Sequence, residues 1–192
     1  KFYDVTAGID NISVVEDAYK NVINTNHFKN KWFSFIHSIV KPYFNNEKIL
    51  IQKLPSINII PSECEVKYVH ETINGFNFHL DSYQPFYHPM FEENFWMPMT
   101  KTDELNDLYF IENNQKKRVD AKLDEIFRFG NNVVHGNMLK NNSKNTRMSM
   151  DFKALLLSNY DEKLITNKTI IKRGKEYKQK DWYSTKYYYM EI

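Results

Sequence analysis

The sequence has few of the features that mark secreted, disulfide-rich or membrane proteins. It contains one cysteine, Cys64, so no disulfide can form within the chain, and we expect a reducing compartment. No apolar run approaches the roughly 20 residues of a membrane-spanning helix. The opening segment KFYDVTAGID also lacks the order of a signal peptide. We therefore predict a cytoplasmic protein that does not enter a membrane.

An excess of charge of one sign is also absent. The 26 lysines and arginines nearly balance the 24 acidic residues, which leaves a formal net charge of +2. A nucleic-acid surface needs a strong basic field around its aromatic side chains. Residues 74–100 are rich in aromatics but contain no lysine or arginine. We therefore expect no nucleic-acid partner, and the oligomeric state stays open.

The chain is instead rich in aromatic residues, with 13 Tyr and 14 Phe among its 192 residues. This composition favours strands over helices. The length fits a single domain, residues 1–192. We divide it into a helical N-terminal support over residues 1–45, a β-barrel core over 46–160 and a C-terminal extension over 161–192.

Periodicity separates the helical part from the strands. Apolar residues recur at helical spacing over residues 13–28 and 29–43, and the second segment ends near Pro42. No long helix interrupts the short runs that follow, which argues against a parallel sheet. Polarity predicts exposed loops at residues 113–118 and 140–146. We predict strands at residues 48–54, 56–60, 65–70, 76–81, 94–100, 107–112, 125–129, 132–135, 147–157 and 169–172, and a strand or surface tail at 182–190.

The clearest chemical signal lies in NGFNFHLDSYQPFYHP, residues 74–89. His79 and Asp81 stand two residues apart, and such residues point to the same face of a strand. His135, in NNVVHGNML, is the best third ligand, because it follows an apolar pair and precedes a glycine. Two histidines and one carboxylate on one side of a metal are the arrangement of non-haem Fe(II) oxygenases.

Other interpretations of these residues stay open at this point. His79 and Asp81 also fit a hydrogen-bonded pair without a metal, and Asp81 fits the cap of a turn. His88, which Pro89 biases towards an extended conformation, is a rival metal ligand. A role for His88 behind the ligands or against the substrate is favoured.

The segment RMSMDF, which begins twelve residues after His135, alternates polar and apolar side chains. As a strand it places Arg147, Ser149 and Asp151 on one face. Arg147 can hold both oxygens of a carboxylate ligand, and the Ser149 hydroxyl adds a directed hydrogen bond. An exposed strand on which Arg147 pairs with an acid is the alternative. The apolar opposite face favours the buried arrangement.

These motifs resemble those of the Fe(II)/2-oxoglutarate-dependent dioxygenases, closest to the streptomycin-biosynthesis dioxygenase-like and phytanoyl-CoA dioxygenase-like proteins. The resemblance rests on HLD at residues 79–81, on His135 and on RMS at residues 147–149. It extends over the longer stretches HLDSYQPFYHPMFEENFWMPMT and HGNMLKNNSKNTRMSMDF. The spacer between them departs from the family, because its acidic and lysine-rich segments replace the expected glycine-bearing loops.

The resemblance implies a mainly β protein with N-terminal helices, whose core is a double-stranded β-helix, a jelly-roll or cupin-like barrel. It implies that His79, Asp81 and His135 hold Fe(II) as the catalytic centre. It also implies that Arg147 binds the cosubstrate 2-oxoglutarate with help from Ser149. The further candidates are Asn94 for the cosubstrate, and Trp96, His88 and Tyr83 for the substrate.

The implied activity is oxidation of a small molecule by dioxygen. The substrate would be a small polar or amino-acid-like metabolite that is hydroxylated while succinate and carbon dioxide are released. One alternative is a non-catalytic barrel that binds a small acid or a metal. Another is an interaction domain in which the His-x-Asp pair holds no metal.

Overall fold

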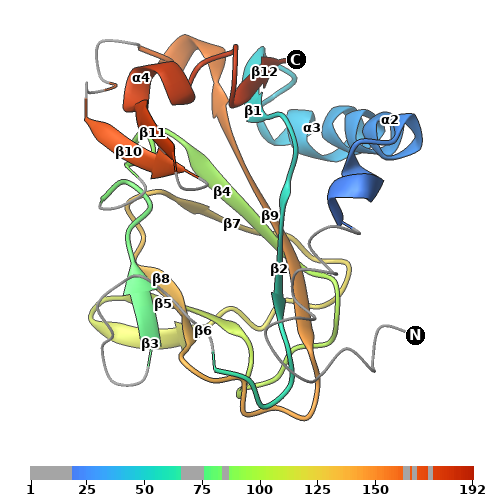
Figure 1. Cartoon of the computed structure of the whole chain (residues 1–192), viewed down its shortest axis with the longest axis vertical. Coiled ribbons are helices and arrows are strands. Elements are labelled where there is room, and N and C mark those ends of the chain that lie inside the picture. The colour runs from blue at the N-terminus through green and yellow to red at the C-terminus, as the bar shows by residue number, and fades with distance from the viewer. Residues whose placement is uncertain (1–18, 66–75, 84–86, 162–164, 166–167, 173–174) are drawn as a thin grey trace.

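The chain folds into a mainly β structure, seen in a computed structural model (Figure 1). Helical residues come before the first strand, and all strand pairs are antiparallel. The predicted class, mainly β with N-terminal helices, is confirmed. The described strands form separate sheets and do not close into a barrel. The structure describes residues 19–65, 76–83, 87–161, 165, 168–172 and 175–192.

The helical region before the sheets contains three consecutive segments. They are α2 (Asn26–Phe35), the π-helical η2 (Ile36–Val40) and α3 (Lys41–Tyr43). The π segment lies just before Pro42, which has no N–H to continue the α-helical hydrogen bonds. The predicted end of the helical region at residue 43 is confirmed.

The predicted helix over residues 13–28 is wrong at its C-terminal end. Residues 19–23 are helical, but a turn at residues 24–25 separates them from α2. Thr25 explains the break, because its hydroxyl donates to the Val22 carbonyl at 2.7 Å and accepts from the Phe28 amide at 3.1 Å. One side chain thus ends the first helix and caps the second. Residues 13–18 lie outside the described residues.

The larger sheet is organised around β9. Its strand order is β12-β1-β9-β4-β7, and β2 also pairs with β9. The register places Asn94 opposite Lys153 and Trp96 opposite Asp151, so these side chains share one face. The strands are β1 (Ile49–Gln52), β2 (Ser56–Ile60), β4 (Glu93–Pro98), β7 (Phe127–Gly130), β9 (Arg147–Leu156) and β12 (Tyr189–Glu191).

The smaller sheet has four strands in the order β3-β8-β5-β6. They are β3 (Phe76–His79), β8 (His135–Met138), β5 (Leu108–Glu112) and β6 (Gln115–Arg118). Arg147 on β9 donates a hydrogen bond to Asn137 on β8, so side chains of the two sheets meet between them.

Strand β6 corrects the prediction of an exposed loop at residues 113–118. Asn113 and Asn114 have φ values of 51° and 61°, as in the two-residue turns that join hairpin strands. Hydrogen bonding to β5 orders the lysine-rich segment although its side chains are largely exposed. Polarity alone therefore misidentified an edge strand as a loop.

Residues 141–146 form a loop, as predicted for 140–146, but the predicted exposure of this segment is wrong at two positions. Asn141 and Ser143 are buried. The Asn141 amide donates to the Ile60 carbonyl at 2.9 Å, and the Ser143 hydroxyl donates to Asp103 at 2.7 Å. Hydrogen bonds to distant residues thus compensate for the burial of these polar side chains.

The C-terminal part contains a hairpin, a short helix and the last strand. They are β10 (Thr169–Lys172), β11 (Lys175–Lys178), α4 (Gln179–Trp182) and β12, while the 3-10 helix η3 (Leu157–Asn159) follows β9. The predicted element at residues 182–190 is therefore a helix end, a turn and the start of β12. The strand predicted at 132–135 begins only at His135, because the Val133 amide turns back to the Gly130 carbonyl at 3.1 Å. Of the strand predicted at 65–70, residues 66–70 lie outside the described residues.

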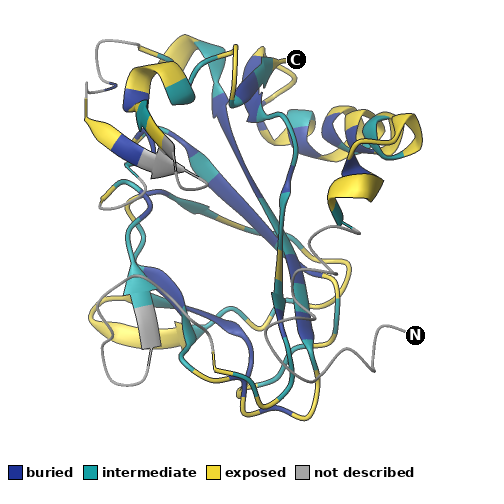
Figure 2. Ribbon diagram, in the orientation of Figure 1, coloured by how far each residue is buried: buried dark blue, intermediate teal, exposed yellow. Residues whose placement is uncertain are grey.

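Apolar side chains pack on both faces of the larger sheet. On one face, helical residues such as Trp32 and Ile36 pack against Phe95 and Phe152. On the other, Leu50 and Leu155 form a second cluster with residues of the C-terminal part. Figure 2 shows the buried residues along β4 and β9 and the exposed outer side of α2. None of the helices formed by the described residues has the length and apolarity needed to cross a membrane.

Candidate metal centre

Strand pairing in the smaller sheet brings the two candidate histidines together. His79 is the last residue of β3 and lies opposite His135, the first residue of β8. Their ring centroids are 4.5 Å apart. Antiparallel pairing therefore joins two histidines that are far apart in the sequence.

Asp81 reaches the same point from a turn. The predicted strand over residues 76–81 ends at His79, because the Tyr83 amide turns back to donate to the Leu80 carbonyl at 3.1 Å. The Asp81 carbonyl then accepts from the His88 amide at 2.8 Å, which fixes the turn. The turn after β3, and not an extended strand, therefore positions Asp81, and the Asp81 side chain still lies beside that of His79.

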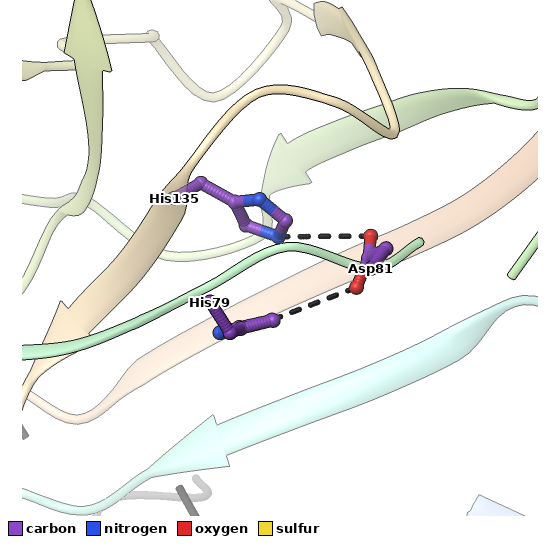
Figure 3. A group of neighbouring side chains, drawn as sticks. All are labelled: His79, Asp81 and His135. Atoms are coloured by element: carbon purple, nitrogen blue, oxygen red, sulfur yellow. Dashed lines mark ion pairs between the residues drawn. The ribbon is translucent and has the colours of Figure 1, made fainter. Parts of the chain in front are cut away.

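The Asp81 carboxylate lies between the two imidazoles (Figure 3). Its Oδ1 is 3.5 Å from His79 Nε2, and its Oδ2 is 3.7 Å from His135 Nε2. One ligand atom from each of the three residues lies within 4.8 Å of the others. These two histidines and one carboxylate could hold a single metal ion.

The surroundings of His135 favour the neutral imidazole, the form that binds metals. Its Nδ1 donates to the Val133 carbonyl at 3.0 Å, which leaves the lone pair on Nε2, the atom nearest Asp81. Burial lowers the pKa of His135 to about 4, although the Asp81 carboxylate opposes this shift. The imidazole is therefore neutral at neutral pH, as a metal ligand must be.

A buried lysine from the larger sheet completes the surroundings of Asp81. Lys153 on β9 places its ammonium 2.7 Å from Asp81 Oδ2. Burial alone would raise the pKa of Asp81, but Lys153 and the neighbouring histidines lower it well below its usual value. Burial likewise opposes the charge of Lys153, whose pKa is nevertheless raised because Asp81, Glu92 and Asp151 surround it. The two groups form a buried ion pair.

Arg147 and Ser149 occupy the inward face of β9, as predicted from the alternation. Arg147 is 1% exposed, and its Nη1 donates to the Asn106 carbonyl at 3.3 Å and to the Asn137 side chain. Ser149 is fully buried, and its hydroxyl has no hydrogen-bond partner among the described residues. A buried hydroxyl without a partner is costly, and a ligand that accepted its hydrogen bond would remove this cost.

The four remaining candidates for contacts with a cosubstrate or substrate differ in how deeply their side chains are buried. Asn94 and Trp96 are buried on the face that they share with Lys153 and Asp151, and the Trp96 ring lies 5.9 Å from the Arg147 guanidinium carbon. His88 is buried and pairs with Glu92, their nearest atoms 2.8 Å apart. Tyr83 is 65% exposed on the turn after Asp81.

Sequence reasoning missed Lys153, and also Asn131 and Glu92, which support its partner Asn94. Its ammonium donates to the side-chain oxygen of Asn94. The Asn94 amide donates to Asn131 at 2.7 Å, and Asn131 donates to Glu92 at 2.9 Å. The alternation of β9 contains the signal for Lys153, because this residue is the next inward position after Asp151. Nothing local indicates the contributions of Asn131 and Glu92.

No protein-family model matches the chain. A curated relative is the streptomycin biosynthesis protein StrG of Streptomyces griseus, 28% identical over 116 residues. The chain is similar to a streptomycin-biosynthesis protein. The match covers 60% of this chain and 51% of StrG, so the chain spans about half the length of the relative. It supports the resemblance based on the histidine, aspartate and arginine motifs.

Among solved structures, the chain is similar to an oxidoreductase of the 2OG-Fe(II) oxygenase family from Burkholderia pseudomallei. The TM-score is 0.44 and the identity 10%. The likeness covers 72% of this chain and 57% of that protein.

Proposed function

We propose that the protein is an oxygenase that depends on Fe(II) and 2-oxoglutarate. The observation that carries the proposal is the convergence of His79, Asp81 and His135, whose ligand atoms lie within 4.8 Å of one another. On the facing sheet, Arg147 adds a cation and Ser149 adds a hydroxyl that has no partner within the described part of the chain.

The donor set fits Fe(II) in type and number. Two imidazoles and one carboxylate leave further positions on the metal for other ligands. The hydrogen bond from His135 Nδ1 to a backbone carbonyl is the support that metal-bound histidines usually have. His79, Asp81 and His135 would hold the metal, which when bound supplies the chemistry that couples dioxygen and 2-oxoglutarate to oxidation of a substrate.

The charges of the inner face favour a dianionic cosubstrate. Arg147 would bind the distal carboxylate of 2-oxoglutarate, and Ser149 would donate its hydroxyl to the same group. Lys153 offsets the charge of Asp81, so the bound metal and Arg147 together face the cosubstrate as a positive site. Both ligand-binding residues are buried, which strengthens their electrostatic attraction.

Aromatic side chains shield the centre from water. The Phe129 ring lies edge-on to His135, with centroids 4.7 Å apart. The Phe127 ring contacts those of Phe129 and Phe110 in tilted arrangements, with centroid distances of 5.3 Å to each. These apolar groups would protect a reactive centre from solvent.

We also propose a small polar or amino-acid-like metabolite as the substrate, and dioxygen as its oxidant. The relative StrG is a streptomycin biosynthesis protein, and this supports a small metabolite as the substrate. Asn94, Trp96, His88 and Tyr83 remain candidates for contacts with the bound molecules. Of these, Trp96 lies next to Arg147, which favours a contact with the cosubstrate.

The decisive test is formation of the anaerobic complex with Fe(II) and 2-oxoglutarate. Wild-type protein should develop the weak visible charge-transfer band of a chelated keto acid, and His79→Ala should lose it because one of three protein ligands is removed. His37→Ala, at an exposed histidine of η2, is the matched control and should retain the band. Absence of the band in wild type, or its persistence in His79→Ala, would contradict the proposal.

A second candidate is a protein that binds a small acid without oxidising it. The ion pair between Lys153 and Asp81 favours this function, because it satisfies the carboxylate without a metal. Succinate release separates the two candidates. The oxygenase releases succinate from 2-oxoglutarate when Fe(II) and dioxygen are present, whereas the binding protein does not.

A further inference from the structure

We infer that Lys153 is a positioning residue that restricts Asp81 to one metal-binding oxygen. The inference rests on the metal site of the proposed function, and it requires neither 2-oxoglutarate nor turnover. A carboxylate can bind a metal through one oxygen or through both. Which of these occurs decides how many positions on the metal remain for other ligands.

The contacts of Asp81 distinguish its two oxygens. Each oxygen faces one histidine, Oδ1 at 3.5 Å from His79 Nε2 and Oδ2 at 3.7 Å from His135 Nε2, but Oδ2 also accepts a hydrogen bond from the Lys153 ammonium at 2.7 Å. A charge-assisted hydrogen bond of this length is among the stronger polar contacts in proteins. Oδ2 is therefore held by the protein, and Oδ1 is the oxygen left for a metal.

Lys153 is itself held in place. Its ammonium also donates to the Asn94 side chain. Lys153 on β9 and Asn94 on β4 lie directly opposite each other in the strand register. Asn131 accepts from the Asn94 amide at 2.7 Å and donates to Glu92 at 2.9 Å. Asn131 is fully buried and Glu92 is 1% exposed.

The far end of this network is equally fixed. Glu92 Oε2 lies 2.8 Å from His88 Nδ1, and Glu92 Oε1 accepts from the Tyr189 hydroxyl. A network in which each member has partners keeps a single geometry. The network thus holds the ammonium beside Asp81, and a metal bound through Oδ1 would keep one more open position than a metal bound through both oxygens.

The test counts the water molecules on bound Mn(II), used as a stand-in for Fe(II), by water-proton relaxation. Lys153→Met removes the ammonium and keeps a side chain of similar length. With Oδ2 released, Asp81 should take a second coordination position, so the bound-water contribution should fall by about one third, from three open positions to two. Lys117→Met, at an exposed lysine of β6, is the control and should match wild type. Thermal unfolding of the metal-free proteins checks that each variant is folded.

An unchanged water count in folded Lys153→Met overturns the inference and leaves the metal site intact. If Lys153→Met does not fold, Asn94→Ala decides, because it removes the second anchor of the ammonium and should also lower the count. An unchanged count in Asn94→Ala then overturns the inference. Failure of wild-type protein to bind Mn(II) overturns both the inference and the proposed Fe(II) function.

Discussion

The inward face of β9 carries three charged side chains, Arg147, Asp151 and Lys153, and each has a different environment. Arg147 and Lys153 are buried cations with polar partners. Asp151 lies between them in the sequence and accepts a hydrogen bond from Asn58. Burial raises the pKa of Asp151 to about 6, against the opposing effect of Lys153. A carboxyl group whose pKa is raised by folding lowers the stability of the protein at those pH values at which the group is ionised.

This shift predicts that Asp151→Asn stabilises the protein at neutral pH. The folded-state pKa lies above the unfolded value, so the penalty is absent below about pH 4, grows up to about pH 6 and is complete above it. The free energy of unfolding should rise by about 1–3 kcal/mol at pH 7.5 and change little at pH 4. Urea denaturation at both pH values measures the difference.

Asp124→Asn is the control for this substitution, because Asp124 is exposed. Its effect on the free energy of unfolding should be small at both pH values. An equal gain for Asp151→Asn at both pH values would show that burial of charge is not the cause.

At the scale of elements, the other face of β9 holds the helical region against the sheet. Phe152 is fully buried and stacks on Phe95 with centroids 5.0 Å apart. Its ring also meets Trp32 edge-on at 5.0 Å, and the Trp32 indole donates to the Lys53 carbonyl at 3.0 Å. Packing of this kind stabilises helices that would not be stable alone.

Phe152→Ala should therefore lower the free energy of unfolding by about 3–5 kcal/mol, because it leaves a cavity between strand and helix. The measurement is chemical denaturation followed by the fluorescence of the three tryptophans, of which Trp32 contacts Phe152. Met148→Ala, at a half-buried position on the same face of β9, should cost clearly less. Equal losses at the two positions would contradict the role of Phe152 as the centre of this packing.

Some elements were predictable from the sequence because their signal is local. Strands β2 and β10 coincide with their predicted ranges, and β9 differs by one residue. Short runs of β-branched residues, or alternation of apolar with polar residues, are enough to identify such strands. Strand β6 was missed because hydrogen bonding to β5, and not the apolarity of its side chains, makes it a strand.

The candidate metal centre was predictable in part for the same reason. His79, Asp81, His135, Arg147 and Ser149 stand in short motifs, whereas Lys153 depends on Asp81, which lies 72 positions away. The alternation of β9 marks position 153 as inward, but a lysine is ordinarily exposed, and the alternation does not show which partner compensates its buried charge. The i, i+2 argument correctly placed the Asp81 side chain beside that of His79. It was wrong about the backbone, because the strand ends at His79 and Asp81 lies on the following turn.

At the scale of the whole molecule, buried polar contacts connect the C-terminal strand with the candidate metal centre. Tyr189 on β12 donates its hydroxyl to Glu92, and Glu92 joins the network that ends at Asp81. The same strand pairs with β1, which places the C-terminal segment beside the first strand (Figure 1). The last strand therefore contributes to the sheet and to the support of the centre.

Tyr189→Phe should lower the free energy of unfolding by about 1–3 kcal/mol, because it leaves the buried Glu92 carboxylate with one donor fewer. Tyr187→Phe, at a residue that is 48% exposed, should change stability little. Urea denaturation of the two variants makes the comparison. If Tyr189→Phe unfolds like wild type, the hydroxyl is not needed to keep Glu92 in place.

The two faces of β9 also limit how the protein can change in length during evolution. A gain or loss of one residue within the strand would exchange the faces, so that Phe152 pointed at Asp81 and the charged side chains met the helices. Substitutions in this strand alter one face at a time, but insertions and deletions disrupt both. Divergence in length is therefore expected in the connecting loops, where it need not disturb the three candidate metal ligands.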